Sequence, residues 1–397
     1  MRRRRCFLPS EIYFVTIRTV EERFALDPHA CPDAWILAEG KQLDFDTKQA
    51  MRERGRACVE RTQALMDDIA KSEQDPKVPR PVVPVETFSD SMPNIIGKCM
   101  ARGIEMFDVH LYGFVWMSNH GHLLLRAPKE NFAEFMAYLN GQIAVDVNRF
   151  LGRKHQLWAR RYAAAPVLNE AAELQMLGYL LANPQNAGIA DSIDEWAGLS
   201  SAPFFFKNCE QRFLHFNRTA WYEQGRPNDI APFLSTVVLE HKLLPQLSSL
   251  EKKKMRRKLR RAIKAQVKSL PLIDTNVDFD PMLPVRRAFI ARTVIPTERP
   301  ESAKNNPRKR SPQPLCHTTK PSLRKLHEEW YREFRIAYVM SSLEYRRGNT
   351  EVEFPPGSFA PSKYPRARHA SDPDAKAKLH PTRRNLEAAD AQATLQA

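Results

Sequence analysis

Two histidines separated by one glycine, His120-Gly121-His122, are the residues of this chain best suited to metal chemistry. They lie between apolar runs that Ser118 and Asn119 interrupt, a pattern typical of strands. In an extended chain residues i and i+2 point to the same face, so both imidazoles project together while Gly121 faces the other way. Two convergent imidazoles favour a divalent metal site. The alternative is a pair of ordinary, partly buried histidines, because a His-x-His pair alone has low specificity.

A second candidate element is a helix predicted over residues 170–188, where leucines recur at i, i+3 and i+7. These leucines are Leu174, Leu177 and Leu181. Tyr179 and Asn183 lie four residues apart and share a face nearly opposite this stripe. Pro184 limits the helix, so Asn183 is expected near its last turn with a free amide. The alternative is a surface tyrosine and a helix-end asparagine.

Four short motifs follow one another along the chain. They are Met117-Ser-Asn-His-Gly-His-Leu-Leu-Leu125, Leu157-Trp-Ala-Arg-Arg-Tyr162, Tyr179-Leu-Leu-Ala-Asn-Pro184 with Ala187-Gly188, and Trp196 with Ser200-Ser201. In this order they resemble the motifs of the single-tyrosine HUH transposases, and most closely those of the REP-associated tyrosine transposases of bacteria. The resemblance extends over residues 10–30 and 90–202, and the remainder of the chain resembles no family in this way.

The resemblance implies cleavage of single-stranded DNA by transesterification, with Tyr179 as nucleophile and His120 and His122 binding Mg²⁺ or Mn²⁺. Asn183 matches the family's polar third ligand, and its carbonyl oxygen suits a hard cation. A phenol, with a pKa of about 10, is a poor nucleophile at neutral pH, so attack requires a polarised phosphate, which the metal supplies. The expected product is a 5′-phosphotyrosine adduct with a free 3′-hydroxyl. Rejoining needs no ATP, and no nucleotide cofactor is expected because no Gly-rich phosphate loop is found.

The resemblance also implies an α+β fold, a ferredoxin-like antiparallel sheet with helices on one face. The sequence pattern after it predicts a basic, mainly helical C-terminal extension. Local patterns predict a first strand at residues 12–19, a hairpin from strands near 107–117 and 120–126, and a helix over 131–150. The predicted divisions are a HUH transposase-like catalytic domain at 1–206 with an insertion at about 28–90, a basic helical region at 207–296, a linker at 297–322, a helical segment at 323–360 and a disordered tail at 361–397. Within the insertion, residues 47–71 are expected to be helical.

Some residues near the motifs have other interpretations. The family motif normally has a bulky apolar residue where this chain has Gly121, and we expect glycine to remove core packing there without removing a ligand. Tyr162 is a rival nucleophile. His110 is either a further ligand or groove residue or, as we favour, an ordinary strand histidine. Asn119 is interpreted as a turn residue between the two strands.

The charge balance permits a nucleic-acid partner, since 61 Lys and Arg outnumber 46 Asp and Glu to give a net charge of +15. Residues 252–268 predict a helix whose apolar stripe docks while its charges face outward. Further basic runs lie at 2–5 and 308–310. The residues expected to contact DNA phosphate are Arg160, Arg161, Arg256, Arg257, Arg260 and Arg261. Such contacts give salt-sensitive affinity with little sequence information, and a solvated face or disordered tail is the alternative for each run.

The six cysteines are scattered without a Cys-x-x-Cys pair, so we expect reduced thiols in a cytosol. No segment is apolar for long enough to span a membrane, and a soluble, cytoplasmic protein without a membrane partner is expected.

Three functions are open at this stage. The first, favoured because His120, His122, Tyr179 and Asn183 are all present, is a transposase-like strand transferase acting on single-stranded or hairpin DNA at hairpin-forming repeats. The second is a catalytically weak DNA-binding regulatory protein. The third is a metal-dependent nuclease that uses water, for which Tyr179 would be dispensable. The DNA sequence recognised, a monomer or homodimer, and a tyrosine acting in cis or in trans are left open.

Overall fold

A computed structural model of the chain describes residues 5–267, 294–299, 314–359 and the backbone of 368–369. Several sequence expectations fall outside these residues. They are the basic residues at 2–4 and 308–310, Lys268, much of the predicted linker at 297–322, and nearly all of the predicted tail at 361–397.

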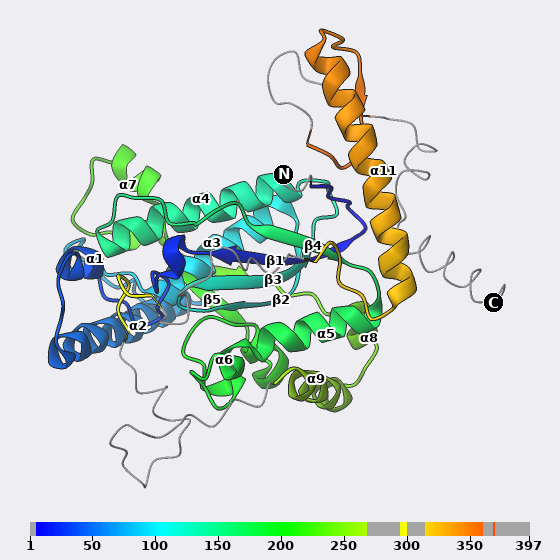
Figure 1. Cartoon of the computed structure of the whole chain (residues 1–397). Helices are drawn as coiled ribbons and strands as arrows, with labels where there is room; N and C mark the ends of the chain where they lie inside the picture. Colours follow the sequence, from blue (N-terminus) through cyan, green and yellow to red (C-terminus); the bar gives the residue numbers. More distant parts are fainter. Residues whose placement is uncertain (1–4, 268–293, 300–313, 360–367, 370–397) are drawn as a thin grey trace.

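A four-stranded antiparallel sheet lies at the centre of the molecule, with the strand order β2-β3-β1-β4 (Figure 1). Its strands are β1 (Ile12–Arg18), β2 (His110–Trp116), β3 (His120–Arg126) and β4 (Ala163–Val167). Helix α3 (Met92–Phe107) joins β1 to β2, and α4 (Phe132–Leu151) joins β3 to β4. This βαββαβ succession confirms the predicted α+β, ferredoxin-like arrangement.

Helices cover both faces of this sheet (Figure 1). Alternate side chains of β1, Tyr13, Val15 and Ile17, join a buried cluster with α3 and α4. The intervening Ile12 and Phe14 join a second cluster with α5 (Glu170–Leu181) and α9 (Lys252–Gln266). Helices α3 and α4 therefore lie on one face as expected, whereas the coverage of the other face by α5 and α9 was not part of the expectation.

Helix α9 has the apolar stripe that its sequence predicts. Met255, Leu259 and Ile263, spaced four residues apart, are its buried residues. The helix approaches α5 so closely that a Cβ added to Gly178 would lie 2.7 Å from the carbonyl oxygen of Ala262. Glycine at this position lets two helix backbones meet, and α5 is consequently held between the sheet and α9.

The insertion and the region after residue 207 pack against each other. Their elements are α1 (Ala34–Ala38), α2 (Phe45–Gln74), β5 (Gln211–Phe216), α7 (Arg218–Glu223), β6 (Leu234–Leu239) and α8 (Pro245–Ser248). Met66 and Ile69 of α2 share a buried cluster with Leu214 and Phe216 of β5. The helix expected at 47–71 is confirmed as α2. The antiparallel β5–β6 hairpin departs from the helical expectation for this region, which α7, α8 and α9 do meet.

The last part of the predicted linker is ordered: residues 317–319 return to the sheet, and α11 (Pro321–Arg346) begins before the predicted end of the linker at 322. The short strands β7 (Glu353–Phe354) and β8 (Arg368–His369) follow α11. The backbone N–H of His317 donates to the carbonyl of Pro166 at 2.8 Å, and Leu168 N–H donates to the carbonyl of His317 at 2.9 Å. Asn169, at the start of α5, hydrogen-bonds with Thr318 and Thr319. Across the ranges described above, none of the helices combines the length and apolar character needed to cross a membrane.

Candidate metal and tyrosine site

The two histidines of the motif lie at the start of β3, on the face of the sheet that α5 covers. In the antiparallel pairing with β1, His120 is opposite Arg18 and His122 is opposite Thr16. The centroids of the two imidazole rings are 5.0 Å apart. His122 is buried, with 4% of its surface exposed, whereas His120 is half-buried. The strand alternation therefore places both rings side by side at the edge of the apolar core.

Helix α5 brings Tyr179 and Asn183 to the same place. The helix ends at Leu181, and Asn183 begins the short helix α6 (Asn183–Asn186), as the following proline suggests. The Nε2 atom of His120 lies 3.2 Å from Oδ1 of Asn183, and the ring centroids of His122 and Tyr179 are 5.7 Å apart. Four residues from two distant motifs thus converge.

Tyr179 lies partly within the apolar core, although its face was predicted to be nearly opposite the leucine stripe. Its ring packs against the same apolar cluster as the buried Leu177 and Leu181, and it meets the ring of Phe14 edge-on at 5.8 Å between centroids. Because the sheet and α9 enclose α5 from two sides, the face opposite the leucine stripe is also partly covered. The tyrosine ring is consequently held in place while the side chain remains half-buried.

Burial keeps both imidazoles uncharged at neutral pH. It lowers the pKa of His120 to about 4, with a further contribution from the nearby Arg18 charge. It lowers the pKa of His122 well below the ordinary range, and His120 and Arg18 add to that effect. A neutral imidazole is the form that binds a metal ion.

The donor set fits a hard divalent cation that accepts nitrogen and oxygen ligands. No cluster of three or more His, Cys, Asp or Glu side chains suited to a metal occurs among the described residues. The side-chain oxygen that could complete a cation site beside His120 and His122 is the amide oxygen of Asn183, which lies 3.2 Å from Nε2 of His120. A side-chain oxygen also meets the other ring nitrogen of each histidine: Thr16 Oγ1 lies 3.0 Å from Nδ1 of His122, and Asn119 Oδ1 lies 2.6 Å from Nδ1 of His120. Such contacts orient metal-binding histidines.

Arg18 is a residue of this site that sequence reasoning did not find. It is exposed, lies directly opposite His120 on β1, and forms an ion pair of 3.2 Å with Glu22. The alternation of Phe14, Thr16 and Arg18 puts the three on one face, but only the pairing of β1 with β3 shows that this face carries the histidines. A positive charge therefore stands beside the histidine pair.

The rival residues lie elsewhere. Tyr162 is buried in the cluster beneath α4, on the other face of the sheet, with the guanidinium of Arg5 4.0 Å from its ring centroid. Burial raises the pKa of Tyr162 to about 12. His110 contacts Arg126, with 3.2 Å between Nδ1 and Nη2, at the opposite end of the β2–β3 hairpin from His120. The fold brings neither residue to the histidine pair.

The predicted basic residues fall into two groups. Arg160 and Arg161 are exposed in the bend before β4, which adjoins β1 because Ala159 N–H donates to the carbonyl of Arg18 at 3.0 Å. The other four lie on α9, as Arg256, Arg257, Arg260 and Arg261. Among these, Arg256 donates from Nε to the carbonyl of Phe205 at 3.0 Å, and the guanidinium of Arg260 lies 4.9 Å from the ring centroid of Phe206. These two arginines thus help attach α9, whereas Arg257 and Arg261 face outward.

Gly121 faces away from the histidines, as expected, but the expectation of lost packing is wrong. It pairs with Trp116 of β2, and a Cβ at Gly121 would lie 2.5 Å from the Cε3 atom of that indole. Trp116 is buried, with 2% of its surface exposed. The indole therefore fills the space that a bulky motif residue would take.

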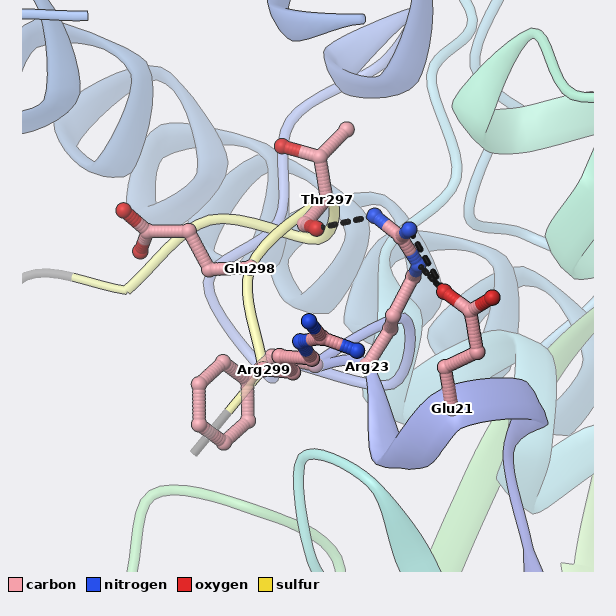
Figure 2. Close-up of a pocket in the computed structure, with 6 residues that line it drawn as sticks. Glu21, Arg23, Thr297, Glu298 and Arg299 are labelled. Carbon is pink, nitrogen blue, oxygen red and sulfur yellow. Dashed lines mark hydrogen bonds and ion pairs between the residues drawn. The ribbon is translucent and has the colours of Figure 1, made fainter. Parts of the chain in front are cut away.

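A polar pocket of about 500 Å³ lies at the turn that follows β1 (Figure 2). Its lining comprises Glu21, Arg23, Phe24, Thr297, Glu298 and Arg299. Arg23 forms an ion pair with Glu21 and donates to the carbonyl of Thr297, while Glu298 accepts from Lys48 at 2.6 Å. These contacts of Arg23 and Glu298 attach residues 297–298 to the turn and to α2.

The βαββαβ sheet thus presents two uncharged histidines to the helix that carries Tyr179. Known proteins with a similar sequence or structure can be compared with this arrangement. Residues 83–183 match the family described as "Transposase IS200 like", which confirms the resemblance for this segment. A solved structure described as "Structure of the REP associates tyrosine transposase bound to a REP hairpin" is similar, with a TM-score of 0.30 and 10% identity over 51% of this chain and 82% of that chain. No curated protein matches the chain.

Proposed function

We propose that this protein cuts and rejoins single-stranded DNA, at repeats that form hairpins, through a covalent bond to Tyr179. The observation that carries the proposal is the convergence of His120, His122 and Asn183 with Tyr179 within the segment that matches the transposase family. These side chains come from β3 and from the end of α5, so the two elements together supply a cation site and a nucleophile.

The chain's own residues prepare the site in two ways. Burial holds both imidazoles in the neutral form, and oxygen atoms of Thr16 and Asn119 fix the orientation of the two rings. A Mg²⁺ or Mn²⁺ ion bound by His120, His122 and Asn183 would offset the charge on a non-bridging oxygen of the scissile phosphate.

Tyr179 supplies the nucleophile in this proposal. Its phenolic oxygen forms a bond to phosphorus as the bond from phosphorus to the 3′-oxygen breaks, the phenol loses its proton, and the 3′-oxygen gains one. The product is a phosphodiester between Tyr179 and the 5′ end of the cut strand, so rejoining by the 3′-hydroxyl needs no external energy source. The contacts of the tyrosine ring with Phe14 and His122 limit the orientations in which the hydroxyl meets the strand.

The positive charges around the site suit a DNA backbone. Arg18, Arg160 and Arg161 lie near one end of β1, and the outward face of α9 adds Arg257 and Arg261 beside the tyrosine helix. Such contacts would position the strand without reading its sequence.

The test is a cleavage assay with labelled single-stranded oligonucleotides that form hairpins, in Mn²⁺ or Mg²⁺, analysed on a denaturing gel. We expect the wild-type protein to form a covalent protein–DNA adduct and Tyr179→Phe and His120→Ala to form none. Tyr162→Phe is the matched control, because this tyrosine lies on the other face of the sheet, and its adduct should persist. Cleavage by Tyr179→Phe without an adduct would instead indicate a nuclease that uses water, and binding without cleavage would indicate a regulatory DNA-binding protein.

A further inference from the structure

Asn119 makes a pair of side-chain contacts that go beyond a role in the turn between β2 and β3. Its Nδ2 donates to the carbonyl of Glu22 at 3.1 Å, and its Oδ1 lies 2.6 Å from Nδ1 of His120. A carbonyl oxygen only accepts hydrogen bonds, so the contact with Glu22 determines which end of the amide faces which partner. The oxygen of Asn119 therefore faces the imidazole.

An amide oxygen also only accepts, and this fixes the proton on the ring. We infer that Asn119 is a positioning residue that holds the neutral His120 in its Nδ1–H tautomer and leaves Nε2 unprotonated on the side of Asn183. The inference rests on the proposed function for its purpose, because the free lone pair of Nε2 is what a cation would bind. The choice of tautomer itself follows from the shorter contact, since the oxygen of Asn119 lies 2.6 Å from Nδ1 and that of Asn183 lies 3.2 Å from Nε2.

The contact of His120 with Asn183, on the other side of the ring, shows why this tautomer matters. Nε2 of His120 and Oδ1 of Asn183 are 3.2 Å apart, and with the proton on Nδ1 both atoms are acceptors. Two acceptors that face each other at this distance repel, so without a cation the amide of Asn183 would turn its N–H toward the ring, whereas a cation held by both atoms would remove the repulsion. Asn119 would thus leave Nε2 of His120 and the oxygen of Asn183 free to serve together as donors to a metal ion.

The carbonyl of Glu22 is presented to Asn119 by an unusual backbone. Glu21 and Glu22 both have left-handed conformations, with φ of 53° and 57°, although neither is glycine. Such residues persist only where their surroundings hold them. Here the Phe24 N–H donates to the carbonyl of Glu298 at 2.9 Å, and the ion pair between Arg23 and Glu21 holds the same turn (Figure 2).

The backbone of Asn119 is fixed as firmly as its side chain. Its carbonyl accepts from the backbone N–H of Thr19 at 3.0 Å, and the hydroxyl of Thr19, also 3.0 Å from this carbonyl, lies closer to the carbonyl of Arg23, at 2.7 Å. The carbonyl of the preceding Ser118 accepts from Leu26 N–H at 2.8 Å. Thr19 is fully buried, so these bonds are protected from water. The turn after β1 consequently forms a rigid support from which Asn119 reaches the histidine.

The experiment is ¹⁵N–¹H correlation NMR of the histidine rings in the full-length protein at neutral pH, free of metal and DNA, with His120→Gln used to assign the signals. We expect His120 to show the Nδ1–H pattern in the wild type and in Asn119→Asp, which keeps an oxygen acceptor. In Asn119→Ala the ring should shift to Nε2–H or to a mixture. Ser118→Ala, one position earlier in the same turn, is the matched control and should leave the tautomer unchanged.

A Mn²⁺ titration of the same variants gives a second readout. Loss of a group that orients a metal ligand typically weakens binding about 10- to 100-fold, and Asn119→Ala should fall in this range while Asn119→Asp and Ser118→Ala do not. An Nε2–H ring in the wild type, or an unchanged tautomer in Asn119→Ala, overturns the inference. If Asn119→Ala does not fold, the tautomer of His120 in the wild type and in Asn119→Asp tests the inference. If the tautomer responds as expected but no covalent adduct ever forms on DNA, the proposed function fails and this inference stands.

Discussion

The two faces of strand β3 show how one short segment serves two purposes. On one face Gly121, Leu123 and Leu125 meet the indole of Trp116 and the helices α3 and α4, and this side is apolar and closed. On the other face, His120 and His122 alternate with them and meet a tyrosine helix. The closed face sets the register of the strand, and the register places the histidines. Chemistry on one side therefore depends on packing on the other.

Substitutions of two neighbouring residues, His122 and Leu123, should separate metal binding on one face of β3 from packing on the other. We expect His122→Ala to abolish Mn²⁺-dependent adduct formation while the protein stays folded, since it removes a proposed ligand. Leu123→Ala, at a fully buried position, should destabilise the fold by about 2–5 kcal/mol because it leaves a cavity. Mn²⁺ titration and urea unfolding of both variants provide the measurement. If Leu123→Ala lost metal binding under conditions where it is folded, the two faces would not be separable.

The closed face can be tested by restoring a bulky residue at Gly121. In Gly121→Leu the new Cβ would lie 2.5 Å from the indole of Trp116, so we expect a loss of about 1–3 kcal/mol in the free energy of unfolding. The control is Gly141→Ala on α4, where an added Cβ meets nothing within 4 Å and stability should hold or rise. Shortening Trp116 in the Gly121→Leu protein should recover part of the loss. Equal stability of Gly121→Leu and wild type would show that the indole moves aside freely.

The smallest expected effect concerns the charge beside the histidines. Replacing Arg18 with glutamine should remove about one phosphate contact, which makes the negative slope of log K against log salt shallower by about 0.7 for a single strand. Arg347→Gln is the control, since this arginine also forms a surface ion pair, 2.8 Å from Glu344, but lies at the end of α11. Fluorescence anisotropy at several salt concentrations supplies the slopes. Identical slopes for Arg18→Gln and wild type would place the strand away from this end of β1.

Local sequence patterns were sufficient for the elements that the site needs. The i, i+3, i+4 spacing of apolar residues predicted α4, alternation predicted β1 and the β2–β3 hairpin, and the proline after Asn183 marked the end of α5. The positions of the two histidines relative to each other followed from strand geometry alone. Each of these predictions depends only on residues that lie close together in the sequence, within one helix or one strand.

Features that depend on pairing between distant segments were missed. The neighbour of His120 is Arg18, about a hundred positions away, and only the β1–β3 register reveals it. The indole that occupies the space above Gly121 likewise depends on the β2–β3 register, which shifts at an irregularity between Leu111 and Gly113. The β5–β6 hairpin was also missed, although Thr236, Val237 and Val238 of β6 favour a strand, because α7 lies between its two strands and no tight turn marks their pairing.

The return of the chain at His317 has a consequence for the order in which the protein is completed. Asn169 and Thr319, which hydrogen-bond to each other, are separated by 150 positions. During synthesis, β4 and the first turn of α5 are made long before the segment that covers them, and until then the strand has an unpaired edge. The start of the tyrosine helix thus acquires these contacts only after residues 317–319 have left the ribosome. An unfinished chain carries the histidines and the tyrosine but not the complete support that holds them together.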